Sequence, residues 1–358
     1  MENNQAVKQK KKLSKGKKIA IIIAAVVAVI LIVVAVYYFV VIKSGRNIYL
    51  GPIYESKEQV YEYFAQEPHN ELCYELSDKK FNKISDKYIK DGEKDSETGI
   101  YETAKKPTAE MQEEIDVANQ FIEDFFVEEY GFSVEEEIEE LTVLTIANLE
   151  EETGAGGVYF LEGEDGFDGK TIVVDEMYIS DLIYAKNDTS GTEYNMEVYY
   201  VSFYEVYIHE TLHYLGCAAE LEDSIDMMYV FEGITEALTI DVIEFAGYEL
   251  SDSGAYIFAT KFAEQILVAD KELVELLVAG EGLISAEEWY DHFDSNSFDG
   301  MGYAITKSVT FVEAERSNVE HQIIAQHIVG EYVKNFELTP EEQIEIADSF
   351  VRPISDVA

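Results

Sequence analysis

One short segment constrains the fold of this chain more than any other, and it runs His209-Glu210-Thr211-Leu212-His213. In a helix, residues i and i+4 lie one turn apart on the same face, so His209 and His213 can turn their imidazoles toward one metal ion. Glu210 lies one step round the helix, where it can exchange a proton with a water at that ion without binding the ion. A catalytic zinc takes three protein ligands and keeps one position open, so the fold must bring one more ligand to this helix.

The predicted third ligand is Glu232, which follows His213 after eighteen intervening residues. It opens the segment 232–238, whose composition predicts the first turns of a second helix. Glu236 lies one turn further on, where its carboxylate can accept a hydrogen bond from a ligand histidine and fix the orientation of that ring. Two carboxylates at i and i+4 repel each other in an ordinary helix, so a bound dication explains the pair better than an exposed helix face does.

This pattern resembles the gluzincins, a group of zinc metallopeptidases that includes thermolysin-like and membrane-alanyl-aminopeptidase-like enzymes. The resemblance is close over residues 209–236. It implies a peptidase that hydrolyses peptide bonds with a zinc-activated water. It also implies that Glu210 is the general base and that Zn²⁺ is bound by His209, His213 and Glu232.

A peptidase of this kind also needs a hydrogen-bond donor for the oxyanion of the tetrahedral intermediate. Residues 302–312 resemble, more weakly, the tyrosine-bearing helix that follows the zinc helices in several gluzincins, which implies this role for Tyr303. His292 and His321 are the other candidates. The GxMEN signature of the aminopeptidase group is absent, because residues 154–157 lack its glutamate.

The motif has two other interpretations. The run His213-Tyr214-Leu215-Gly216 matches the start of the metzincin motif, but its third histidine would fall at position 219, which is Ala219. Alternatively, the helix is structural and its histidines bind no metal. Apolar residues around the motif predict a buried helix, however, and buried imidazoles and carboxylates need partners.

The amino terminus predicts a membrane anchor. Residues 19–42 contain no charged side chain, and this apolar segment is long enough to span a bilayer. Seven lysines precede it. The positive-inside rule then places the amino terminus in the cytoplasm and the rest of the chain outside the cell membrane. A cleaved signal peptide is the alternative, but its apolar region is usually only about 7–15 residues long.

Cys73 and Cys217 follow the span, and they form either one disulfide or two buried thiols.

The charge balance limits the kinds of molecule that the chain can bind. There are 26 basic and 72 acidic residues, a net charge of −46, so a nucleic-acid partner is excluded on electrostatic grounds. Peptides and divalent cations remain possible partners, and the acidic loops 163–169 and 291–299 are candidates for a structural Ca²⁺ although neither has EF-hand spacing. The alternative to a peptidase is a non-catalytic acidic ectodomain that binds a partner or calcium.

Four regions are predicted along the chain: a basic cytoplasmic tail (1–18), a transmembrane helix (19–42), a stalk or small subdomain (43–107) and a metallopeptidase domain (108–358). Within the last region, a helix is predicted from Thr108 to Gly131 and helices predominate after 232. Strands are predicted at 141–146, 157–161 and 171–174. Together with the resemblance, this order predicts an α+β, zincin-like, two-lobed fold with a small sheet, an active-site helix and a mainly helical lobe. The strand 157–161 would pair with an extended substrate.

Overall fold

The computed structural model describes the chain from residue 79 to residue 351 with several gaps. All of these residues belong to one compact unit. The predicted tail and transmembrane helix, both cysteines and most of the stalk lie outside the described residues, as does most of the loop 163–169. The described ranges are 79–84, 100–162, 167–190, 192, 194–216, 227–249, 256–278, 286–316 and 319–351.

The first long helix, α4 (Ala109–Phe125), confirms the predicted start at Thr108. The Thr108 side chain accepts a hydrogen bond from the backbone N–H of Met111 at 3.3 Å and so caps the helix. Buried apolar residues follow one another three or four positions apart along α4, which gives the helix a single apolar face. A π-helical turn, η3 (Phe126–Tyr130), continues it and ends at Gly131, whose positive φ of 81° favours glycine.

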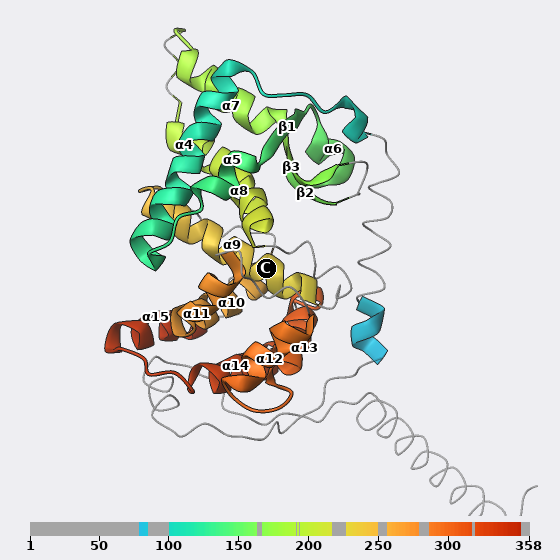
Figure 1. Ribbon diagram of the computed structural model, residues 1–358, viewed down its shortest axis with the longest axis vertical. Coiled ribbons are helices and arrows are strands. Elements are labelled where there is room, and N and C mark those ends of the chain that lie inside the picture. Colours follow the sequence, from blue (N-terminus) through green and yellow to red (C-terminus); the bar gives the residue numbers. More distant parts are fainter. Residues whose placement is uncertain are drawn as a thin grey trace, which may run out of the picture. The chain divides into compact units, whose positions relative to one another are not determined.

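A three-stranded sheet follows, in the order β1-β3-β2 (Figure 1). The strands are β1 (Thr142–Ile146), β2 (Gly157–Glu162) and β3 (Asp168–Asp175), so a strand is present at each of the three predicted positions. β1 runs parallel to β3, whereas β2 runs antiparallel to it. Residues 172–174 of the central strand β3 are all buried, as expected for a strand covered on both faces. Among the described strands β2 pairs with β3 only, so it lies at an edge of the sheet.

Two helices follow the sheet, α7 and α8, and the second contains the motif. Asp175 ends β3, and its carboxylate accepts the N–H of Met177 at the start of α7 (Glu176–Asn187) and the N–H of Glu150 in α6 (Leu149–Thr153). The next helix, α8 (Met196–Leu215), contains the HExxH motif and packs against α4, α7, α9, β2 and β3. Its buried surface extends over several sides, which explains why the segment is so apolar.

The remainder of the described chain is helical (Figure 1). Residues 302–335 do not form one continuous helix, because the backbone leaves the helical conformation at Glu315 (φ −131°, ψ 53°). In order, the carboxyl-terminal helices are α9 (Met228–Phe245), α10 (Ile257–Ala269), α11 (Lys271–Val278), α12 (Ala286–Ser295), α13 (Met301–Ala314), α14 (Val319–Val333) and α15 (Pro340–Val351).

The predicted α+β, zincin-like, two-lobed fold is wrong as a fold class, because the protein is mostly helical and its described sheet has only three strands. The sequence pattern predicted the helix that contains the HExxH motif, but not the two short helices before and after β1. The acidic segment α5 (Glu135–Glu140) has a single buried residue, Ile138, and α6 is only five residues long. Neither helix presents the repeated apolar spacing by which an amphipathic helix is recognised.

The predicted membrane localisation also needs correction. None of the helices in the described part of the chain is both long enough and apolar enough to cross a bilayer. Even α9, which is largely buried, has four acidic residues along its length (Glu232, Glu236, Asp241 and Glu244), and charged side chains are costly within a membrane. The apolar run 19–42, on which the prediction of a cell-membrane protein with an extracytoplasmic domain rested, lies outside the described residues.

Candidate metal centre

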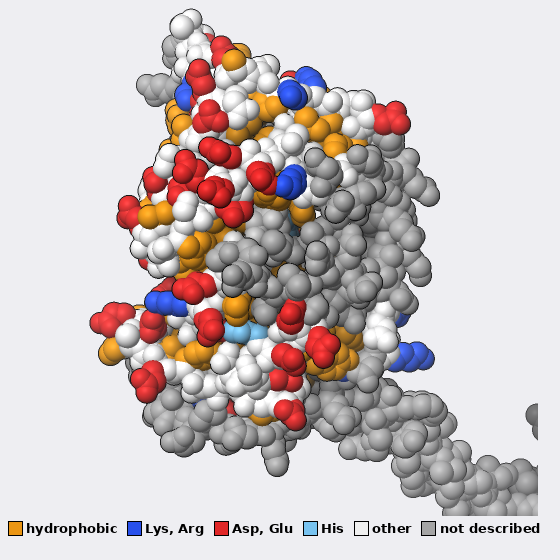
Figure 2. Space-filling view, in the orientation of Figure 1, with side chains coloured by type: hydrophobic (Ala, Val, Ile, Leu, Met, Phe, Trp, Pro, Cys, Tyr) orange, Lys and Arg blue, Asp and Glu red, His pale blue; other side chains and the backbone are white. Residues whose placement is uncertain are grey.

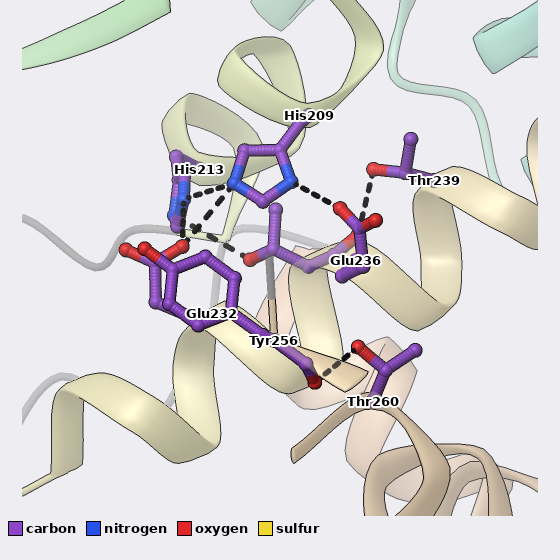
Figure 3. A network of polar contacts seen from close by, with 8 residues as sticks. His209, His213, Glu232, Glu236, Thr239, Tyr256 and Thr260 are labelled. Carbon is purple, nitrogen blue, oxygen red and sulfur yellow. Dashed lines mark hydrogen bonds and ion pairs between the residues drawn. The ribbon is translucent and has the colours of Figure 1, made fainter. Parts of the chain in front are cut away.

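Helices α8 and α9 bring the three predicted ligands together (Figure 3). The Nε2 atoms of His209 and His213 lie 3.0 Å apart. Oε2 of Glu232 lies 3.2 Å from Nε2 of His209 and 3.3 Å from Nε2 of His213. In a tetrahedral zinc site with bonds of about 2.0–2.1 Å, neighbouring ligand atoms are about 3.3 Å apart. The spacing of the three atoms therefore fits one small cation.

The protonation of His209 is set by a second carboxylate. Glu236, one turn after Glu232 on α9, places Oε2 3.0 Å from Nδ1 of His209. A carboxylate can only accept a hydrogen bond, so Nδ1 donates and carries the proton, and the Nε2 lone pair of a neutral ring then points into the centre. The other oxygen of Glu236, Oε1, is buried without a hydrogen-bond partner among the described residues.

The electrostatics of the centre favour a positive charge between the ligands. Burial alone would lower the pKa of His209, but the carboxylates of Glu232 and Glu236 outweigh it and raise this pKa well above its usual value. Burial opposes ionisation of Glu232 too, yet His213 and His209 hold its pKa well below the usual range. Either a proton on His209 or a bound metal ion would supply the positive charge that the carboxylates favour. The donor set therefore fits a divalent cation that takes the place of the proton.

Glu210 lies beside the centre and is not one of the three ligands. Its side chain is buried, and burial raises its pKa despite the nearby His209 and His213. The backbone N–H of Tyr159 in β2 donates a hydrogen bond to its carboxylate. Gly157, at the start of β2, gives this carboxylate its space, because a Cβ at position 157 would lie 2.5 Å from Cγ of Glu210. Strand β2 therefore passes directly against the predicted general base.

The predicted oxyanion candidates lie on other helices and are not among the metal ligands. Tyr303 of α13 is 39% exposed, and its ring contacts those of Phe81 and Tyr290. His292 of α12 is buried with Nε2 2.7 Å from Oδ2 of Asp270. His321 of α14 packs its ring on Phe311. The role predicted for Tyr303 stays a prediction, whereas the two histidines have local structural partners.

Sequence reasoning missed Tyr256, the residue that precedes α10. In Figure 3 its side chain points toward Glu232, while its backbone carbonyl accepts a hydrogen bond from Thr260 at 2.8 Å. Gly233 was missed as well, although it follows a predicted ligand. A Cβ at position 233 would lie 2.6 Å from the backbone carbonyl of Ala259, so α9 and α10 are in close contact there. No spacing rule marks one tyrosine among 25, so nothing in the sequence identified Tyr256.

The predicted calcium loop 163–169 lies mostly outside the described residues, within which His209, His213 and Glu232 form the only group of three or more His, Cys, Asp or Glu side chains close enough to hold one metal ion. In the loop 291–299, the carboxylate of Asp294 instead accepts the backbone N–H groups of Gly300 and Gly302 at 2.8 Å and so supports the start of α13.

No protein-family model, curated protein or solved structure matched this chain. The resemblance to the gluzincins therefore rests on residues 209–236, on the weaker match at residues 302–312 and on the geometry of the centre.

Proposed function

We propose that this protein is a zinc-dependent peptidase. The observation that carries the proposal is the convergence of His209, His213 and Glu232 at ligand–ligand distances of 3.0–3.3 Å. The motif alone is compatible with a structural helix, but a structural helix does not require two imidazole nitrogens and a carboxylate oxygen to meet at one point. The buried Glu210 beside this point supports a catalytic rather than a purely structural metal site.

When bound, zinc supplies a Lewis acid that polarises a peptide carbonyl and makes water more acidic. The chain's own residues supply the proton transfers. Glu210 accepts the proton of the attacking water on a carboxylate oxygen and returns it to the nitrogen of the leaving amine. Burial raises the pKa of Glu210, which makes its carboxylate a stronger base for this proton transfer. Glu236 holds His209 in the orientation that binding requires.

The edge of β2 provides a surface for an extended peptide. β2 pairs with β3 along one side. On its other side, the backbone N–H of Tyr159 donates a hydrogen bond to the proposed catalytic residue Glu210, so this side of β2 faces the glutamate. A peptide added along this side would gain main-chain hydrogen bonds and would run past Glu210. Acidic side chains far outnumber basic ones on the visible face in Figure 2, which favours substrates with positive charge.

Two measurements on the full-length chain test this function. Zinc content after loading and dialysis should be about one ion per chain in the wild type and should be lost or greatly weakened in Glu232→Ala. Digestion of a peptide library, read by mass spectrometry, should show cleavage by the wild type. In Glu210→Gln cleavage should fall by about 10²- to 10⁴-fold while zinc is retained. A wild type that takes up no zinc, or a Glu210→Gln variant that cleaves as fast as the wild type, would overturn the proposal.

A further inference from the structure

The start of α10 lies against the metal-binding helix α9. Gly233, the residue after the ligand Glu232, permits the contact because a Cβ there would lie only 2.6 Å from the backbone of Ala259. Tyr256 is one turn before Ala259, and its side chain points toward Glu232 (Figure 3). The position of the first turn of α10 therefore decides where the tyrosine side chain lies in relation to the metal ligand.

That first turn lacks a cap from its own residues. Tyr256 is the N-cap residue and makes no side-chain capping hydrogen bond. The first backbone N–H groups of a helix have no partner within it, so they need an external acceptor when they are buried. Glu313 of α13 provides it, since its Oε2 accepts the N–H of Phe258 at 3.2 Å and of Ala259 at 3.1 Å. More than fifty residues separate Glu313 from these two donors.

Glu313 is well placed for this task. Its side chain is 1% exposed, and its other oxygen, Oε1, is ion-paired with Arg316, which lies three residues later, just beyond the end of α13. A carboxylate at a helix amino terminus also interacts favourably with the helix dipole, and hydrogen bonds to a charged acceptor are about twice as strong as neutral ones. A buried carboxylate that only filled space would be costly, so its hydrogen bonds to α10 are the reason that it can be tolerated there.

We propose that Glu313 is a positioning residue of the metal centre, which holds the first turn of α10 so that Tyr256 is directed at Glu232. This inference rests on the proposed zinc site, and it assigns Tyr256 a place in that site. Gly233 sets how closely α10 approaches α9, whereas Glu313 fixes the turn from which Tyr256 projects. Loss of the Glu313 hydrogen bonds would let this turn fray, and the phenol ring would move away from Glu232 without any change in the ligands themselves.

The test uses full-length Glu313→Met, which keeps a side chain of similar length but removes the acceptor, beside Glu313→Gln, which keeps an acceptor oxygen. Tyr256→Phe and the double variant Glu313→Met/Tyr256→Phe complete the set. The visible absorption spectrum of each Co²⁺-loaded protein reports the geometry of the ion. Glu313→Met should shift this spectrum in the same way as Tyr256→Phe, and the double variant should shift it no further. Glu313→Gln should shift it in the same direction but less than Glu313→Met does.

A second readout needs no metal. Nitration of individual tyrosines by tetranitromethane, located by mass spectrometry, measures how accessible each ring is. In Glu313→Met, Tyr256 should react several-fold faster than in the wild type, while Tyr184, which is 64% exposed on α7, serves as the unchanged reference. If the wild type takes up no Co²⁺ or Zn²⁺, the proposed function fails, but the nitration rates still decide whether Glu313 holds Tyr256.

A folded Glu313→Met variant with wild-type nitration of Tyr256 would overturn the proposal. So would a double variant whose spectrum shifts by the sum of the two single changes, because Glu313 would then act independently of Tyr256. If Glu313→Met does not fold, Glu313→Gln decides alone. Its neutral oxygen accepts weaker hydrogen bonds from the two N–H groups than a carboxylate does, so Tyr256 should be nitrated faster than in the wild type, and an unchanged rate would contradict the proposal.

Discussion

Gly157 and Glu210 are in direct contact across the sheet and the motif helix, so closely that a Cβ on residue 157 would lie 2.5 Å from Cγ of the glutamate. Such a separation is far below an ordinary carbon–carbon contact of about 3.5–4.0 Å. The residue type at the start of β2 therefore controls the place of the predicted general base, although 53 positions separate the two residues in the sequence.

Gly157→Ala should displace the Glu210 carboxylate while leaving the three metal ligands in place. A displacement of about 1 Å at a reacting group can lower the rate about 10²-fold, so kcat for peptide cleavage should fall by about that factor. Zinc stoichiometry should remain at the wild-type level, and this measurement is the control. Full activity in Gly157→Ala would show that Glu210 does not act from the position seen in the structure.

Glu236→Ala should weaken zinc binding without removing a ligand. The substitution leaves Nδ1 of His209 without its acceptor, and removal of such a supporting carboxylate typically lowers metal affinity by about 10- to 100-fold. Competition with a chelator of known affinity would measure the change. Glu244→Ala is the matched control because Glu244 is an exposed glutamate on the same helix, α9. Equal affinities in the two variants would contradict the role assigned to Glu236.

Gly233→Ala should destabilise the protein by forcing α10 away from α9. Two of the three atoms closest to the added methyl belong to the backbone of Ala259, so a change of rotamer cannot relieve the overlap. Overpacking of this kind typically costs about 1–3 kcal/mol of unfolding free energy, which urea denaturation of the metal-free chain would measure. Adding Ala259→Gly should not restore stability, because the backbone atoms remain. Full recovery in the double variant would show that only the two side chains compete for space.

Asp241 should make the protein less stable as the pH rises from acid to neutral. Loss of hydration beside the surrounding protein raises its pKa to about 7 although the residue is exposed at the surface, and repulsion from four glutamates adds to the effect (Glu264, Glu345, Glu244 and Glu129). The folded state therefore binds the proton more tightly than the unfolded state, whose carboxyl titrates near 3.9. Its stabilising contribution is complete below a pH of about 3.9 and is lost as the pH rises through about 7.

Thermal unfolding between pH 4 and pH 8 would check this expectation. Asp241→Asn should raise the midpoint at pH 8 and change it little at pH 4, so that the difference from the wild type grows with pH. Asp181→Asn, which removes an exposed carboxylate on α7, is the control for a general change in net charge. The same pH profile in Asp241→Asn and the wild type would rule out the raised pKa.

The site illustrates how far local sequence rules extend. The spacing of His209 and His213 places both rings on one face of any helix, so that pairing required no knowledge of the fold. The capped start of α4 at Thr108 and the three strand positions were likewise predictable, because each depends on residues next to one another in the chain. The fold class was not predictable in the same way, since short acidic helices such as α5 carry almost no apolar pattern.

The sequence by itself determined a pair of histidines on one helix face and proposed Glu232 as their partner. Only the tertiary structure decided that the carboxylate reaches both rings, that β2 passes against Glu210, and that the first turn of α10 is held by Glu313. The physical reason is the range of the interactions. Helical spacing is set by hydrogen bonds between residues four apart, whereas these contacts join segments whose distance depends on how the whole core packs.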